Sequence, residues 1–380
     1  MKKNKQDWMK NIMMHDYVKV NNDVYFFSLN FNGLYKKNLL TKELEFLGSA
    51  PNELTFRKHL YGAIIEHNAK LYMPPMNGDE ICIYDISSKS FCKRALNFDA
   101  KDMASKFYGA LSYENKVIFI PGRYPYIVVI DTEKEEIEYI DCWRKLLVIP
   151  DDYKGFYVKN GFFIKENILY IATMVDGCII KLNLDTYQCE KVQMISESEG
   201  YLDMCLDEEN DEVWMICYKN HHIIRYNEKT MEEDILDNFP ENYVINEYGE
   251  NKESTMPFIN IICCDKNVYA IAYQANMTVK IDKQTSRITE VVQDTRPEYK
   301  GFNEWKARHY FGKVIDQEHW ILANIDDNSF YLMQGDRLKE IINLYDENSR
   351  GNLLFYAQEY VVESGVYGVG EYIKYIKSLK

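Results

Sequence analysis

Short runs of apolar residues recur along the chain, and turn-forming polar residues bound each of them. Seven such runs are centred on positions 25, 72, 118, 170, 214, 269 and 320. Successive centres lie 44 to 55 residues apart, with a mean of about 49. Runs this short, rich in Val, Ile, Tyr and Phe, predict half-buried β-strands rather than helices.

A second marker keeps a constant distance from the strand centres. In six of the seven units an Asx residue stands 13 positions after the centre, at Asn38, Asp85, Asp131, Asn183, Asn227 and Asp282. In five units a Thr or Ser follows three residues later, at Thr41, Ser88, Thr186, Thr230 and Thr285. An Asx side chain accepts hydrogen bonds from backbone N–H groups just ahead of it, so this spacing predicts a tight turn. The seventh unit breaks the pattern, because Met333 occupies the position.

Each unit therefore contains four strands, as the third unit illustrates. Its strands are expected at Tyr108–Tyr113, Lys116–Pro121, Ile127–Asp131 and Glu136–Ile140. One four-stranded sheet cannot bury both of its faces, whereas successive sheets packed face to face can. The repeat thus predicts an all-β fold, a seven-bladed β-propeller of four-stranded antiparallel blades. The blades are expected near residues 14–48, 58–96, 106–141, 157–195, 200–237, 257–293 and 308–344, within a propeller of residues 1–344. Residues 345–380 are expected to form a strand and a short C-terminal helix packed on the propeller.

The repeat resembles those of the kelch, Trp-Asp-repeat and related propeller superfamilies, over roughly Met14 to Leu344. Kelch blades carry a Gly-Gly doublet after the second strand, and Trp-Asp repeats carry that dipeptide at the end of the third. This chain has neither feature at those places. The resemblance therefore implies the propeller fold and no family-specific function.

The amino-acid composition of the chain narrows the classes of molecule that it is expected to bind. The chain is 46% hydrophobic, which supports a large core, and its net charge is −14. Such an acidic chain is a poor candidate for binding nucleic acid or an anionic membrane. No apolar run reaches the length of a signal peptide or a membrane-spanning helix, so we predict a cytoplasmic protein. The nine cysteines include no CxxC pair, and we expect reduced thiols. No motif predicts a metal or another cofactor.

Candidate ligand-binding residues come from the loops. The spacing between the second strand and the Asx turn is nearly constant, so length variation falls in the connections between blades. In propellers these connections share one face with the loops between second and third strands, around the mouth of a central channel, and long loops on a rigid scaffold often carry function. Both loop classes are rich in cations and aromatic rings here. The candidates are Arg57, His59, Tyr61, Tyr108, Arg123, Tyr124, Tyr126, Trp143, Arg144, His221, His222, Tyr273, Trp305, Arg308 and Tyr310.

Rings and cations together suit a ligand with flat faces and negative charge. The first hypothesis is a non-enzymatic propeller that binds an acidic or sugar-like small molecule, or a protein segment. The second is a carbohydrate-active hydrolase or lyase with its site at the channel mouth. The third is an assembly scaffold. No GxSxG, HExxH, GxGxxG or GxxxxGK[ST] motif occurs, so the sequence favours binding over catalysis.

Overall fold

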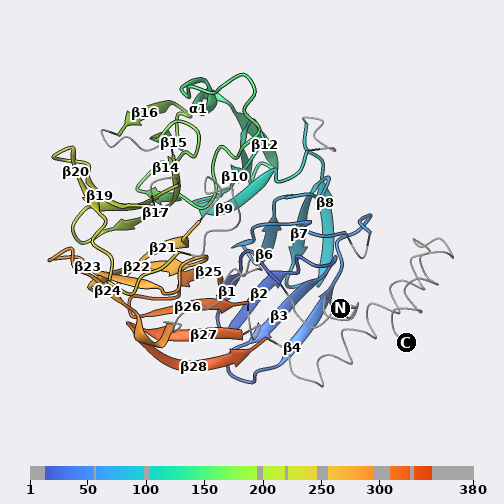
Figure 1. Ribbon diagram of the computed structural model, residues 1–380. Helices are drawn as coiled ribbons and strands as arrows, with labels where there is room; N and C mark the ends of the chain where they lie inside the picture. The colour runs from blue at the N-terminus through green and yellow to red at the C-terminus, as the bar shows by residue number, and fades with distance from the viewer. Residues whose placement is uncertain are drawn as a thin grey trace, which may run out of the picture. The chain divides into compact units, whose positions relative to one another are not determined.

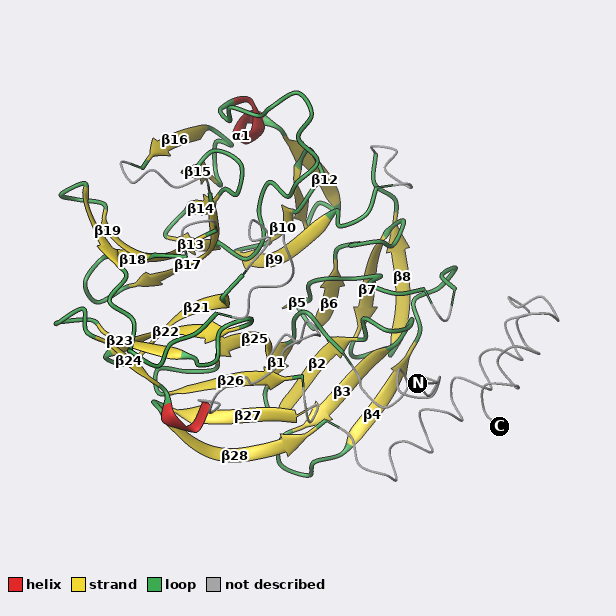
Figure 2. Cartoon of the chain, viewed as in Figure 1, coloured by secondary structure: helices red, strands yellow, loops and turns green. Residues whose placement is uncertain are grey.

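The chain folds into seven sheets of four antiparallel strands each (Figure 1, Figure 2). In this computed structural model the described residues are 13–54, 57–97, 103–194, 200–218, 221–245, 256–294, 309–325 and 329–344. Every sheet is built from one contiguous segment, and its strands pair in chain order. The sheets are the blades of a seven-bladed β-propeller, which confirms the predicted fold class. The expected C-terminal extension, residues 345–380, lies outside the described residues.

The strands of the first four blades have the following bounds. Blade 1 consists of β1 (Val18–Val20), β2 (Asp23–Phe27), β3 (Leu34–Asn38) and β4 (Leu44–Gly48). Blade 2 consists of β5 (Ile65–His67), β6 (Lys70–Met73), β7 (Ile81–Asp85) and β8 (Ser90–Arg94). Blade 3 consists of β9 (Phe107–Tyr113), β10 (Lys116–Pro121), β11 (Ile127–Asp131) and β12 (Glu136–Ile140). Blade 4 consists of β13 (Phe162–Lys165), β14 (Ile168–Ala172), β15 (Cys178–Asn183) and β16 (Cys189–Gln193).

The last three blades repeat the arrangement. Blade 5 consists of β17 (Tyr201–Asp207), β18 (Glu212–Cys217), β19 (Ile223–Asn227) and β20 (Glu232–Leu236). Blade 6 consists of β21 (Phe258–Cys264), β22 (Asn267–Ala272), β23 (Val279–Asp282) and β24 (Ile288–Glu290). Blade 7 consists of β25 (His309–Val314), β26 (His319–Asn324), β27 (Ser329–Gln334) and β28 (Arg337–Asn343). Among the described residues two short helices interrupt the pattern, α1 (Cys142–Lys145) and the 3-10 helix η3 (Val292–Asp294). In the described segments, no helix has the length and apolarity needed to cross a membrane.

The chain divides into two compact units, which are described separately here. The first unit holds blades 1 and 2 and comprises Met1–Ala104, Asp327–Ser329 and Ile342–Lys380. The second unit holds blades 3 to 6 and most of blade 7, and comprises Ser105–Asp326 and Phe330–Ile341. Within the second unit the first strands of consecutive blades lie side by side, as β17, β21 and β25 show (Figure 1).

Packing between neighbouring blades provides the core. In the second unit one apolar cluster joins blades 5 and 6 through Trp214, Phe258 and Met277, and another joins blades 3 and 4 through Val129 and Leu169. The third strand of blade 3, predicted as a continuous apolar run, is buried from Ile127 to Ile130. Burial on both faces is what a blade in the middle of a stack requires, so the apolar runs are explained by the fold.

The Asx turns form as their spacing predicts. The side-chain oxygen of each Asx residue accepts the backbone N–H three residues ahead, at 2.8 Å for Asn38 and 3.2 Å for Asn227. The same bond occurs at Asp85, Asp131, Asn183 and Asp282. These N–H groups lower the pKa of the Asp85, Asp131 and Asp282 carboxyls. In the seventh unit Gly335 adopts a φ of 54° instead, a conformation that glycine adopts without strain.

The cysteines require one correction. We expected nine thiols, but Cys142 and Cys189 form a disulfide, with their Cα atoms 5.9 Å apart. Cys142 begins α1, which packs against β16, where Cys189 is the first residue. The connection after β12 therefore folds back over the next blade and brings the two residues within disulfide range. The other seven cysteines are thiols.

Candidate functional site

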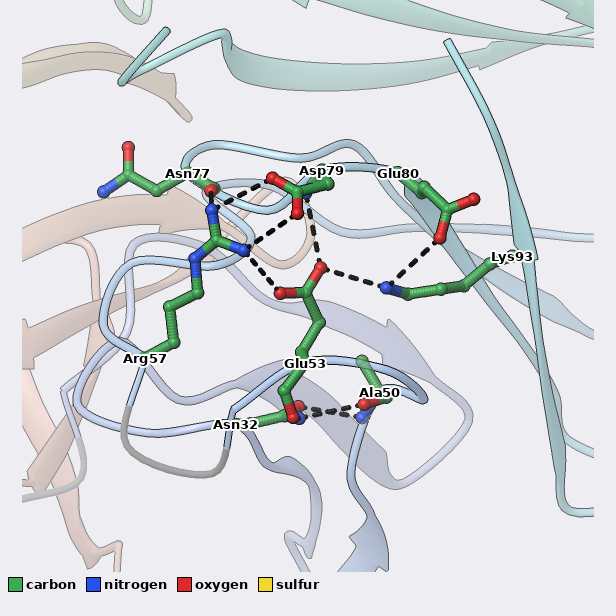
Figure 3. A network of polar contacts seen from close by, with 8 residues as sticks. All are labelled: Asn32, Ala50, Glu53, Arg57, Asn77, Asp79, Glu80 and Lys93. Atoms are coloured by element: carbon green, nitrogen blue, oxygen red, sulfur yellow. Dashed lines mark hydrogen bonds and ion pairs between the residues drawn. The ribbon is translucent and has the colours of Figure 1, made fainter. Parts of the chain in front are cut away.

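The candidate cation Arg57, in the first unit, is held inside the protein's own charge network (Figure 3). Its guanidinium donates to both carboxylate oxygens of Asp79, at 3.0 and 3.2 Å, and to the carbonyl of Asn77. It also donates to Glu53 at 2.8 Å. Fork-shaped pairing of this kind fixes a guanidinium in place and uses its donors. Arg57 therefore anchors the connection between β4 and β5 and has few donors left for a ligand.

Glu53 is the centre of this network. Its side chain is 1% exposed, and it also accepts a hydrogen bond from Lys93 Nζ at 2.9 Å. Below it, Asn32 donates to the carbonyls of Ala50 and Glu53 and accepts the N–H of Ala50 (Figure 3). A buried carboxylate needs such partners, because an isolated one would be strongly destabilising. The network thus fixes the path of the β4–β5 connection.

Three of the predicted aromatic residues belong to the core. Tyr61 packs edge-on against Phe27 and is 2% exposed. Tyr124 and Trp143 are fully buried, and Trp143 donates its ring N–H to the carbonyl of Ile140 at 3.1 Å. Large rings fill the space between blades, which is their expected structural use. The geometry gives these three rings a packing role.

The remaining candidates are spread over both units. His59 contacts His15 in the first unit, with ring centroids 5.8 Å apart, and burial lowers the pKa of His59. In the second unit Arg144 is exposed on α1, and its guanidinium lies 5.4 Å from the centroid of the Tyr157 ring.

Three further candidates lie in loops between second and third strands. Tyr126 lies between Tyr124 and Tyr139, while His221 and His222 lie between β18 and β19. No metal-binding group of His, Cys, Asp or Glu occurs in the described parts of the chain. Trp305 and Arg308 lie outside the described residues.

A cluster of rings around Arg123 brings several candidates together in the second unit. The Arg123 guanidinium lies over the Phe156 ring, 4.5 Å from its centroid, and Tyr108 meets the same ring edge-on at 5.3 Å. Tyr153 donates its hydroxyl hydrogen to the Phe156 carbonyl. We call Tyr108, Arg123, Tyr153 and Phe156 the Arg123 cluster. Its members come from β9, the β10–β11 loop and the connection between blades 3 and 4.

The loop that carries Arg123 is held firmly. The backbone N–H groups of Gly122 and Arg123 donate to the carbonyls of Lys106 and Ser105, and the Gly122 carbonyl accepts the N–H of Tyr157 from the connection to the next blade. A Cβ atom at Gly122 would lie 2.5 Å from the Tyr108 ring and 2.6 Å from the Ser105 carbonyl. Glycine is therefore required there, and the guanidinium is positioned before any ligand arrives.

Arg123 has no anionic partner within the described residues. Its Nε atom is buried and has no hydrogen-bond acceptor, and the guanidinium forms no ion pair there. Arg57 and Arg225, in contrast, are paired with Asp79 and Asp234. A buried donor without an acceptor destabilises a protein by about 1–3 kcal/mol.

The tyrosine side chains in and around the Arg123 cluster remain uncharged at neutral pH. Burial raises the pKa of Tyr108 and, more strongly, that of Tyr153, to about 12. Burial also raises the pKa values of Tyr273 and Tyr310, and a charge on nearby Tyr310 or Tyr108 would raise the pKa of Tyr273 further. The predicted residues Tyr108, Arg123, Tyr273 and Tyr310 therefore share one region. The Tyr108 hydroxyl donates to Ser105 Oγ at 3.5 Å, and the neutral hydroxyl of Tyr310 is suited to donate a hydrogen bond to an acceptor.

Lys159 is a basic residue that the sequence analysis missed. Its Nζ lies 3.4 Å from the thioether sulfur of Met256, a weak acceptor, and it has no carboxylate partner in the described part of the chain. Burial lowers the pKa of Lys159 to about 8. The N–H of Met256 in turn bonds to the side chain of Gln274, which connects Lys159 to the segment that carries Tyr273. Its sequence neighbours form no motif, and the missing counter-charge is visible only in three dimensions.

Asp203 forms a separate buried polar centre on β17. It accepts N–H groups from Asn260, Ile261 and its own neighbour Met204, at 2.8 to 3.0 Å. Asn260 also accepts the N–H of Gly312, which links β17, β21 and β25. Burial nevertheless raises the pKa of Asp203 to about 7. These bonds tie three consecutive blades together, so Asp203 has a structural role.

Comparison with known proteins supports the fold and leaves the function open. No protein-family profile and no curated protein matches the sequence. Among solved structures, the chain is similar to one titled "Streptogramin B lyase structure", at 14% identity and a TM-score of 0.56, covering 87% of this chain and 94% of that one. It is also similar to a chain of a mitotic checkpoint complex, at 10% identity and a TM-score of 0.56, covering 86% and 87%.

A third similar structure is the Kuenenia stuttgartiensis hydrazine synthase, at 11% identity and a TM-score of 0.56, covering 85% of this chain and 96% of that one. The three names describe different functions on one fold. Identities this low show a common fold alone, so the function must be argued from the side chains of this chain.

Proposed function

We propose that this propeller is a binding protein for a small organic anion that carries a sugar or aromatic ring. The observation that carries the proposal is the Arg123 guanidinium, which lies over Phe156 without an anionic partner in the described residues. In a chain of net charge −14, a positioned and unpaired guanidinium is unusual. A carboxylate or phosphate would accept its free N–H groups in pairs.

The neighbouring side chains support the same ligand class. Lys159 adds a second cation without a carboxylate partner in the described residues. The Tyr310 hydroxyl supplies a donor, and the rings of Tyr108, Tyr273 and Tyr310 supply flat apolar faces. Rings stack on sugar and aromatic faces, whereas cations hold the charge. These features favour binding of a small acidic molecule over the scaffold hypothesis, which uses none of them.

Isothermal titration of the full chain with glucuronate and uridine diphosphate, and with neutral glucose as a reference, tests the proposal. We expect at least one anion to bind and glucose to bind far more weakly. A hydrogen bond to a charged group contributes about 1.5–3 kcal/mol, so Arg123→Gln should weaken anion binding by about 10- to 100-fold. Arg144→Gln is the matched control, because that exposed arginine also lies over a ring.

The outcomes separate the hypotheses. Absence of binding by either anion, or equal losses in the two arginine variants, would reject the proposal. Conversion of a bound sugar acid during the titration would favour the carbohydrate-active enzyme instead. Thermal melts of both variants, compared with the wild type, show whether a loss of binding reflects a loss of folding.

A further inference from the structure

Two thiols on neighbouring blades lie within bonding reach of each other. Cys205 is on β17 of blade 5, and Cys263 is on β21 of blade 6. Their sulfur atoms are 3.1 Å apart, closer than an ordinary contact between two sulfurs. Both side chains are only partly buried, at the edge of the apolar cluster that joins the two blades. β17 and β21 pack side by side, so the pair is held in register by the fold.

The surroundings of the pair distinguish its two members. Burial raises the pKa of Cys205, and the hydrogen bond to Cys263 raises it further. Cys205 therefore remains a thiol at neutral pH, and the two sulfurs share a hydrogen bond in which either can be the donor. Lys283 lies near the two cysteines, and its ammonium charge interacts with both sulfurs. Its Nζ atom forms an ion pair with Asp207 at 2.8 Å. Cys263 thus has both a cation and a second thiol beside it, a setting typical of reactive cysteines.

We propose that Cys205 and Cys263 form an oxidisable dithiol site, whose oxidant is a hydroperoxide such as hydrogen peroxide. The Cys263 thiolate attacks a peroxide oxygen; the S–O bond forms, the O–O bond breaks, and the leaving hydroxide takes up a proton as water. The Cys205 sulfur then attacks Cys263, the S–S bond forms, and the S–O bond breaks, releasing a second water with the proton of Cys205. The two sulfurs lose two electrons, and the peroxide gains them.

The product is a covalent link between blades 5 and 6. It joins first strands that otherwise touch through side chains and the Asp203–Asn260 contact. The link does not involve the Arg123 cluster, so the inference is independent of the proposed function. Cys92 is an exposed thiol on β8, and its oxidation can be compared with that of Cys205 and Cys263 in the same sample.

Treatment of the full chain with hydrogen peroxide, followed by alkylation under denaturing conditions and peptide mass spectrometry, tests the site. We expect a cross-linked peptide pair containing Cys205 and Cys263, lighter than the two thiol peptides by two hydrogen atoms. In Cys205→Ser the second step is impossible, so Cys263 should accumulate as a sulfenic acid that a dimedone probe captures. In Cys263→Ser the cross-link should be absent, and Cys205 should stay open to alkylation.

Two results would overturn the proposal. One is a protein whose Cys92 is oxidised while Cys205 and Cys263 are still fully alkylated. The other is a disulfide from either residue to a different cysteine, such as the adjacent Cys264. Both readouts are covalent and are taken from the wild type first, so they do not depend on whether a variant folds. Cys92→Ser should leave the cross-link unchanged.

Discussion

Replacement of Glu53 by Gln is expected to loosen the first unit of the propeller. The side chain keeps its shape but loses its charge, and one of its oxygens becomes an NH2 group. The native oxygens accept from Arg57 at 2.8 Å, from Lys93 at 2.9 Å and from the N–H of Asp79 at 3.3 Å. Whichever way the amide is turned, its NH2 group must face a donor. At least one charged hydrogen bond is therefore lost.

The size of the expected loss of stability depends on the ion-pair partners that Arg57 and Lys93 keep in the variant. Breaking a buried ion pair typically destabilises a protein by about 3–5 kcal/mol when a charge is left without a partner. Here Arg57 keeps Asp79, and Lys93 keeps Glu80 at 3.5 Å. We therefore expect a smaller loss of stability, about 2–3 kcal/mol, since a charged hydrogen bond contributes about 1.5–3 kcal/mol. This corresponds to a fall in melting temperature of about 4–12 °C.

Hydrogen exchange detected by mass spectrometry is the suitable assay, because it resolves the first unit from the second. Peptides spanning residues 49–57 and 77–93 should exchange about 30- to 140-fold faster in Glu53→Gln, by the usual conversion of free energy to an equilibrium constant. Glu80→Gln is the control: its side chain is 35% exposed and makes one ion pair at 3.5 Å. It should change stability by less than about 1 kcal/mol. Equal effects of the two substitutions would refute the reasoning.

Two further predictions concern buried titratable groups of the second unit. Burial raises the pKa of Asp203 from 3.8 to about 7. Between about pH 4 and pH 7 the folded chain holds a proton that the unfolded chain has lost, so this residue's contribution to stability declines over that window, by about 4 kcal/mol in total. Urea titrations from pH 4 to 8 should show this decline in the wild type relative to Asp203→Asn, and a constant difference between the two would contradict it. For Lys159, the rate of reductive methylation against pH should have its midpoint near 8. A midpoint near 10.5 at Lys159 would place its amine in water and weaken the proposed anion site.

Much of the fold could be predicted from the sequence, because its signals are local. The Asx turn at Asp131 depends on residues three apart, and the strand from Ile127 to Asp131 depends on a continuous apolar run. The turn signal and the strand signal both recur in the other blades, so a strand misassigned in one unit can be corrected by comparison with the others. The seventh unit lacks the Asx residue and still forms its turn through Gly335. Periodicity over the whole chain thus carried more information than any one motif.

The candidate site was harder to predict, because the state of a cation depends on its partners in space. Arg57 and Arg123 lie in the two loop classes that the sequence marks as rich in cations and rings, and nothing in the sequence separates their roles. Only the structure shows that Asp79, 22 residues from Arg57, neutralises it, while Arg123 has a ring beneath it and no carboxylate in the described residues. The disulfide was missed for a related reason. Cys142 and Cys189 are 47 residues apart, close to one repeat, and that coincidence was the available signal.

Each sheet is one uninterrupted piece of chain, and this has a consequence for how the gene can be rearranged. No described sheet borrows a strand from a distant part of the sequence. A cut in a connection between blades therefore leaves every strand ladder intact. New termini placed in such a connection, with the original ends joined by a linker, divide no hydrogen-bonded sheet. By the same logic a blade can be duplicated or deleted as a single segment of about 49 codons, so change in blade number requires one recombination event rather than several coordinated ones.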